Sequence, residues 1–214
     1  EREWLIANRL GAYASSTVAG CNTRRYHGLL VAAAEPPVGR LLALANVLEQ
    51  ITVDGDATDL ATNEFDGAFS PTGYQHLTHF ERDVIPHFVY TVGEGTLTKD
   101  ILLAESANTV SIRYTWRGPA CDLSLRPLVA LRNFHHTRRA GAAPLMTFHA
   151  AEGGVVVHDH TTTAHDLHLT SPEATFQADA SWWYDFRYRA DEARGFGDHE
   201  DLYTPGSFTW ELAD

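Results

Sequence analysis

Several common signals of function are missing from this sequence. Its only two cysteines, Cys21 and Cys121, stand far apart and outside any metal-binding spacing, so no disulfide framework or cysteine-ligated zinc site is indicated, and we expect both thiols to be reduced. No apolar run approaches the roughly 18 residues of a membrane-spanning helix, and no signal-type segment opens the chain. The P-loop, the dinucleotide glycine fingerprint and the GxSxG motif are also absent. These absences argue against membrane insertion, nucleotide chemistry and a nucleophile-elbow hydrolase.

Basic charge is scarce as well. Lys and Arg together number 16 against 28 Asp and Glu, which gives a formal net charge of -12. A molecule with this charge repels nucleic-acid phosphates and anionic membrane surfaces. We therefore expect a neutral ligand, with neither a nucleic-acid nor a membrane partner. The sequence also has no initiator Met and stops abruptly after residues 210–214, which predicts a segment of a longer protein.

Strand patterns dominate what is present. Apolar and polar residues alternate over residues 110–116, 186–189 and 208–212, so each run can bury one face and expose the other. Asp54-Gly55, Gly93-Glu94-Gly95 and Glu152-Gly153-Gly154 separate apolar runs and predict hairpins. Residues 38–50 fit either a helix or a strand. So many short antiparallel strands predict an all-β fold in two packed layers, with residues 1–214 as a single β-sandwich domain.

Three clusters could carry function. The first is TRRYHGLL at residues 23–30, whose guanidinium, phenol and imidazole groups suit sugar hydroxyls, although the arginines could equally pair with carboxylates. The second cluster is Arg132, Asn133, His135 and His136. It follows an apolar run that contains Pro127, which predicts an edge strand or a bulge. The third surrounds Trp182 and Trp183, which point to opposite faces of a strand, so one indole is expected to be exposed. The candidate residues are Arg24, Arg25, Tyr26, His27, Arg132, Asn133, His135, Trp183, Glu192, Arg194, Glu200 and Asp201.

Two kinds of catalytic centre could in principle be built from residues of this sequence. Glycoside hydrolysis needs two carboxyl groups, and Glu192 with Glu200 or Asp201 could supply them, but an acidic chain offers many such pairs. His158 and His160 fall on one strand face, as in a cupin metal site, but Thr163 and Ala164 stand where the acidic ligand would follow. Neither pattern is specific, and we expect no metal and no other cofactor.

The sequence closely resembles one family over almost its whole length. The similarity is carried by the run from Asn8 to Val31 and by shorter motifs at residues 3–5, 125–128, 132–135, 192–195, 200–202 and 205–206. These motifs are similar to the N-terminal domain of prokaryotic-type glycogen debranching enzymes, the amylo-α-1,6-glucosidases. Arg9, Ala12 and Ser16 depart from the glycines that are usual or frequent there in the family.

The resemblance implies a large antiparallel super-β-sandwich of the galactose-mutarotase-like or glucoamylase N-terminal type. It also implies that a C-terminal (α/α)6 barrel, absent here, carries the hydrolytic carboxylates. The segment would be the non-catalytic part of a cytoplasmic glycoside hydrolase that removes α-1,6-linked glucose at glycogen branch points. Its expected partners are an α-glucan, such as glycogen or a maltooligosaccharide, and the barrel of the same chain.

Two rival hypotheses remain beside this one. The first is a purely structural module that docks the barrel, and the second is an autonomous hydrolase that uses Glu192 with Glu200 or Asp201. The leading hypothesis expects the side chains of Arg24, Arg25, His27, Arg132, His135 and Trp183 to share one rim of the sandwich.

Overall fold

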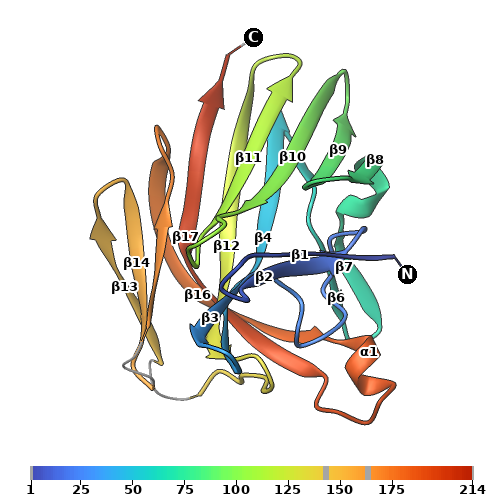
Figure 1. Cartoon of the computed structure of the whole chain (residues 1–214). Coiled ribbons are helices and arrows are strands. Elements are labelled where there is room, and N and C mark those ends of the chain that lie inside the picture. The colour runs from blue at the N-terminus through green and yellow to red at the C-terminus, as the bar shows by residue number, and fades with distance from the viewer. Residues whose placement is uncertain (1, 142–144, 162–164, 214) are drawn as a thin grey trace.

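The structure is a computed structural model that describes residues 2–141, 145–161 and 165–213 (Figure 1). Strands make up 65% of the described residues and helices 4%, so the predicted all-β class is confirmed. The short helical elements are a 3-10 turn, η1 (Gly73–His76), and one helix, α1 (Arg189–Glu192). No helix among the described residues has the length and apolar character needed to cross a membrane.

The first layer is one large antiparallel sheet. Its strand order is β1 (Glu3–Ala7), β2 (Tyr13–Thr17), β3 (Gly28–Glu35), β4 (Gly39–Val53), β12 (Cys121–Asn133), β17 (His199–Leu212) and β16 (Thr175–Arg187). The short strand β5 (Asp56–Asp59) also pairs with β4. The neighbouring strands β4, β12 and β17 run through the middle of the molecule (Figure 1).

The second layer consists of two smaller antiparallel sheets. One has the order β11 (Val110–Arg117), β10 (Gly95–Leu103), β9 (Pro86–Val92) and β8 (Leu77–Arg82), and the other has β13 (Met146–Ala151), β14 (Gly154–Asp159) and β15 (Asp166–Thr170). A separate hairpin joins β6 (Thr62–Phe65) to β7 (Ala68–Thr72). Both smaller sheets contribute to the same buried cluster as the large sheet, which confirms the predicted sandwich.

The large sheet buries apolar side chains on both faces. In β4, Ala43, Val47 and Ile51 point into the cluster between the layers, whereas Leu42 and Ala45 join a second cluster on the opposite face. That burial on both faces explains why residues 38–50 lack a clean alternation, and the segment is a strand. The outer cluster lies beneath the candidate site described below.

Local expectations were partly met. The three predicted turns join β4 to β5, β9 to β10 and β13 to β14. Pro127 is not on an edge strand, since β12 lies between β4 and β17, but it does lie at a bulge, because the pairing with β17 is interrupted between Leu125 and Val129. The strand predicted over residues 186–189 is wrong in its second half, because β16 ends at Arg187 and α1 begins at Arg189.

The outer side of the four-stranded sheet carries a charged cluster around Asp100. His87 Nδ1 lies 2.6 Å from one carboxylate oxygen, and Arg113 Nη2 donates to the other at 2.8 Å. Burial acts to raise the pKa of Asp100, but the hydrogen bonds from His87 and Arg113 outweigh it and hold this pKa below its usual value of 3.8.

This lowered pKa predicts a contribution to acid stability. Because the folded-state pKa lies below the unfolded one, the contribution is fully present above pH 3.8 and is lost as the pH falls through the folded-state value. Asp100→Asn should therefore make the free energy of unfolding fall less steeply below pH 3.8 in urea titrations. Glu94→Gln, at an exposed turn, is the control. An unchanged slope for Asp100→Asn would contradict the assignment.

Candidate functional site

The loop that leads into β3 is fixed by its own histidine. His27 is buried, and its Nδ1 accepts a hydrogen bond from the backbone N–H of Thr23 at 3.1 Å, so in the neutral ring the proton lies on Nε2. That nitrogen faces Glu3 Oε1 at 3.7 Å, and Arg24 Nε donates to the same oxygen at 2.8 Å. At Gly28 a Cβ would come within 2.1 Å of a leucine side chain of β4, so the close approach of β3 requires glycine. Arg24 and His27 therefore anchor the loop against β1.

Arg25 points the other way, toward α1. Its backbone N–H donates to Asp191 Oδ2 at 2.6 Å, and its Nη1 donates to the carbonyl oxygen of His135 at 2.9 Å. The ring of Phe196 lies 4.9 Å from the guanidinium carbon, a distance that allows a cation–π contact. Arg25 Nη2 is buried and has no hydrogen-bond partner among the described residues. One side chain thus joins three segments that are distant in the sequence.

Tyr26 adds a second aromatic ring to the group around Arg25. Its hydroxyl lies 3.1 Å from His135 Nδ1, and its ring meets Phe134 edge-on at 5.3 Å. The rings of Phe134 and His135 are 4.1 Å apart. His135 and Phe196 are exposed, whereas the other three side chains are partly buried. We call the five residues Arg25, Tyr26, Phe134, His135 and Phe196 the arginine–aromatic face.

A buried ion pair supports this face from beneath. The side chains of Arg132 and Glu200 are 4% and 0% exposed, and both Nε and Nη2 of the arginine donate to the carboxylate, the latter at 2.7 Å. Tyr188 donates its hydroxyl to Glu200 Oε2 at 2.5 Å, and the backbone N–H of Arg138 donates to Oε1 at 3.1 Å. Nη2 of Arg132 also donates to the carbonyl oxygen of Arg25 at 3.0 Å. The pair is therefore connected directly to the loop that carries the face.

The protonation states of these buried residues follow from their surroundings. Burial acts to lower the pKa of Arg132, but the charge and hydrogen bonds of Glu200 raise this pKa overall. The pKa of Tyr188 is well above its usual value because of burial first and the neighbouring Glu200 second. Arg132 is therefore charged and Tyr188 is a neutral donor, so Glu200 is held by a permanent set of donors.

The backbone of β12 bends where it places Arg132. Its pairing with β4 is irregular between Val129 and Arg132, and Leu131 has a φ of 42°. A non-glycine residue in this left-handed region costs on the order of 1 kcal/mol, and such bulges re-aim side chains. A second bulge in β16 has Asp185 at a φ of 61°, with its N–H bonded to Asp201 Oδ1 at 2.9 Å. Two of the four described non-glycine residues with positive φ, Leu131 and Asp185, thus lie at bulges beside the residues of the candidate site.

More ion pairs flank the buried pair of Arg132 and Glu200. Arg138 pairs with the buried Asp159, and Arg139 Nη1 contacts Asp201 at 3.0 Å and Asp185 at 2.5 Å. Ala140 donates its backbone N–H to the remaining oxygen of Asp201 at 2.8 Å. These contacts fix the segment after β12 against β14 and β17.

The twelve predicted site residues therefore separate into groups. Arg25, Tyr26 and His135 come together at the surface, with Arg132 and Glu200 buried beneath them. Asn133 supports the turn, because its Oδ1 accepts the N–H of His135 at 2.9 Å. Three other predicted residues belong to that structural framework, namely Arg24, His27 and Asp201. Glu192 pairs with Arg187 at 2.5 Å, and Arg194 is exposed just after α1.

The expected exposure of one tryptophan is wrong. Trp182 and Trp183 do point to opposite faces of β16, but each is partly buried, Trp182 against the cluster between the layers and Trp183 against the outer cluster. The exposed ring is instead Phe196, which is 53% exposed. It lies between Gly195 and Gly197, where no periodic pattern marks it, and only the neighbouring glycines could have indicated a loop.

The residues that could serve catalysis or metal binding are engaged by other side chains. Glu200 and Asp201 are 0% and 4% exposed and engaged by arginines, so a glycosidic oxygen has no access to them. His158 Nδ1 lies 2.5 Å from Asp166, and His160 Nε2 lies 2.9 Å from the hydroxyl of Thr147. Within the described ranges, no three His, Cys, Asp or Glu side chains are grouped to hold a metal ion. Thr163 and Ala164 lie outside these ranges.

Comparison with known proteins identifies the family. The family model described as "Glycogen debranching enzyme N terminal" matches residues 2–214. No curated protein and no solved structure matches the chain. The match implies that the chain is part of a larger glycogen debranching enzyme, and it confirms the resemblance found in the motifs around residues 8–31. With its all-β sandwich and this match over nearly its entire length, the chain belongs to the glycogen debranching enzyme N-terminal family.

Proposed function

We propose that this domain is a non-catalytic part of a glycogen debranching enzyme and that its arginine–aromatic face engages the α-glucan substrate beside the catalytic barrel. The single observation that carries this proposal is the convergence of His135 and Phe196, from two distant segments, on one accessible surface that the largely buried Arg25 holds together. An exposed imidazole, here that of His135, can bind sugar hydroxyls, and an exposed ring, here that of Phe196, packs on the apolar face of a pyranose. The hydrolytic acids belong to the barrel in this scheme, which agrees with the burial of Glu200.

The setting is consistent with a cytoplasmic enzyme. Cys21 and Cys121 are both buried, and neither takes part in a disulfide. Burial, and then the neighbouring Asp122, raise the pKa of Cys121, so its thiol is protonated and unreactive. A reducing compartment suits such residues, and glycogen as a neutral polymer suits the net charge of -12.

Calorimetric titration of maltooligosaccharides against this domain tests the proposal. Phe196→Ala should weaken a saturable binding about tenfold, because the lost ring contact is worth on the order of 1.4 kcal/mol. Phe69→Ala is the matched control, since Phe69 is also an exposed ring that stacks on an arginine, Arg189, at 4.7 Å, but lies on the β6–β7 hairpin. Equal losses for both variants, or no saturable binding by the wild-type domain, would reject the proposal.

A second candidate function is docking of the barrel alone. Tyr184 and Phe196 are 59% and 53% exposed, and large exposed aromatic residues are typical of protein interfaces. This alternative predicts that Phe196→Ala in the full-length enzyme weakens the cohesion of the two domains while the affinity for maltooligosaccharides is unchanged. Limited proteolysis of the connection between the domains, measured beside sugar affinity, separates the two functions.

A further inference from the structure

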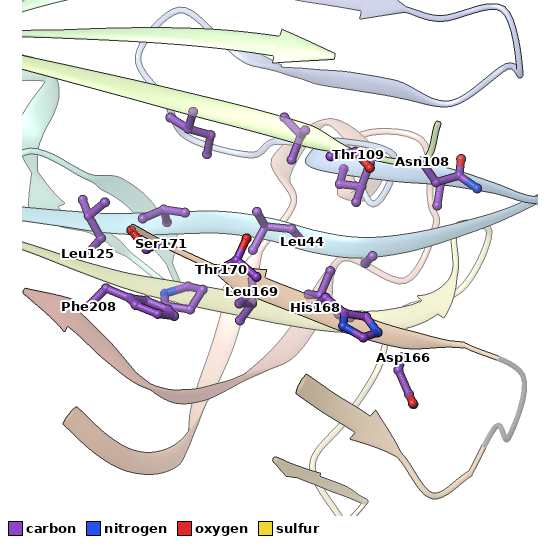
Figure 2. Close-up of a pocket in the computed structure, with 18 of the residues that line it drawn as sticks. Leu44, Asn108, Thr109, Leu125, Asp166, His168, Leu169, Thr170, Ser171 and Phe208 are labelled. Atoms are coloured by element: carbon purple, nitrogen blue, oxygen red, sulfur yellow. The ribbon is translucent and has the colours of Figure 1, made fainter. Parts of the chain in front are cut away.

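A long groove opens between the two smaller sheets. Its volume is about 640 Å3, and its floor is formed by apolar side chains of the large sheet, among them Leu44, Leu125 and Phe208. One wall is β11 with the preceding residues Asn108 and Thr109, and the other is β15 with the adjoining residues 165 and 171. In Figure 2, Asn108 and Thr109 lie on one side of Leu44, and His168, Leu169 and Thr170 lie on the other. The second layer of the sandwich is thus interrupted along a seam.

Both walls of the seam are unpaired strand edges. Over the residues that the structure describes, β11 pairs only with β10, and β15 pairs only with β14. Each edge therefore presents a row of backbone N–H and C=O groups without partners in a neighbouring strand. Such rows are templates for the addition of another strand.

The apolar side chains along the seam are incompletely buried. In β10, the core-facing Leu97 and Ile101 are each 1% exposed, whereas the core-facing Val110, Ile112 and Tyr114 of β11 remain only partly buried. Leu169 of β15 is likewise only partly buried. The apolar interior therefore continues to the seam and meets solvent there, which is unfavourable for the isolated domain.

We propose that the seam between β11 and β15 receives one extended strand from the remainder of the glycogen debranching enzyme. The family implies that such a remainder exists. An extended chain can satisfy both edges at once, and alternate side chains would cover the apolar floor. The outward-facing residues of the two walls are polar, Ser111 and Arg113 on β11 and Asp166 and His168 on β15, so outward-pointing positions of the added strand should be polar. The added strand would join the two smaller sheets into one continuous second layer.

Hydrogen exchange in the full-length enzyme tests this inference, independently of sugar binding. An edge strand leaves about half of its amides without a ladder partner, so a free β11 or β15 should lose about half of its amide protection within seconds. With the added strand, nearly all amides of peptides covering residues 110–117 and 166–170 should exchange at least about 100-fold more slowly. The edge strand β13, which does not line the groove, is the internal control, and about half of its amides should still exchange within seconds. Fast exchange of half the amides in both β11 and β15 would overturn the inference.

Two variants and one dilution complete the test. Leu169→Asp places a charge toward the groove and should restore fast exchange in β11, whereas His149→Asp, at an exposed position of β13 that does not line the groove, should not. If Leu169→Asp fails to fold, the exchange pattern of the wild-type enzyme still decides the question. Protection that disappears on dilution would assign the strand to a second copy of the protein and would also overturn the inference.

Discussion

Arg132→Met is expected to destabilise the protein by about 3–5 kcal/mol, because it leaves the fully buried carboxylate of Glu200 without its guanidinium partner. Tyr188 and the backbone N–H of Arg138 would still donate to Glu200, but neither carries a compensating charge. The carbonyl oxygen of Arg25 would lose its donor in the same variant, so the loop that carries the arginine–aromatic face should loosen. Urea unfolding measures the loss of stability, and near-UV circular dichroism reports the aromatic packing.

Two further variants show whether the lost charge pairing is the cause. In the double variant Arg132→Met, Glu200→Gln no buried charge is left unpaired. The Gln carbonyl oxygen can accept from the backbone N–H of Arg138 and its NH2 can donate to the Tyr188 hydroxyl, so most of the lost stability should return. Arg9→Met breaks an ion pair whose side chains are 80% and 68% exposed and should change stability by less than about 1 kcal/mol. An Arg132→Met variant as stable as Arg9→Met would show that the buried pair has no such role.

Lys99→Met should have an effect of similar size in the centre of the sandwich. Lys99 is the only lysine in the sequence, and its Nζ lies 2.5 Å from Glu49 Oε1, with both side chains less than a tenth exposed. The contact links β10 to β4, and therefore one layer to the other. Removal of the ammonium leaves a buried carboxylate, which costs about 3–5 kcal/mol. At roughly 2–4 °C per kcal/mol for a domain of this size, the melting temperature should fall by about 10 °C.

The neighbouring tyrosine determines the best control for this pair. Tyr114 donates its hydroxyl to Glu49 Oε1 at 2.8 Å, and its pKa is well above the usual value because of burial and, second, the charge of Glu49. Glu49→Gln added to Lys99→Met preserves this acceptor and removes the unpaired charge, so we expect calorimetry to show a melting temperature near that of the wild type. A double variant less stable than Lys99→Met would contradict this explanation.

The fold could largely be predicted from the sequence, because a strand with one solvent-exposed face has a recognisable alternation of polar and apolar residues. The alternation in residues 110–116 and 208–212 follows directly from a sheet packed on one side, as observed in β11 and in the end of β17. The segment at residues 38–50 was ambiguous because β4 is buried on both faces, which erases the period of two. The break between the two smaller sheets has no local signal at all, since it depends on which strands pair at long range.

The candidate site was less predictable for a related reason. The motif at residues 23–30 correctly indicated a concentration of polar and aromatic groups, but exposure depends on partners that the local sequence does not reveal. Arg132 is buried because Glu200, 68 positions further along the chain, meets it from the neighbouring strand β17. His27 is buried because its ring closes its own loop. Residue type alone therefore could not separate the exposed members of the face from the side chains that support them.

The most direct measurement of the central claim is a crystal structure of the full-length enzyme with a bound maltooligosaccharide. We expect a glucose ring packed on Phe196, with sugar hydroxyls hydrogen-bonded to His135 and the catalytic acids supplied by the barrel. A sugar chain that passes through the active site without touching the arginine–aromatic face would contradict it.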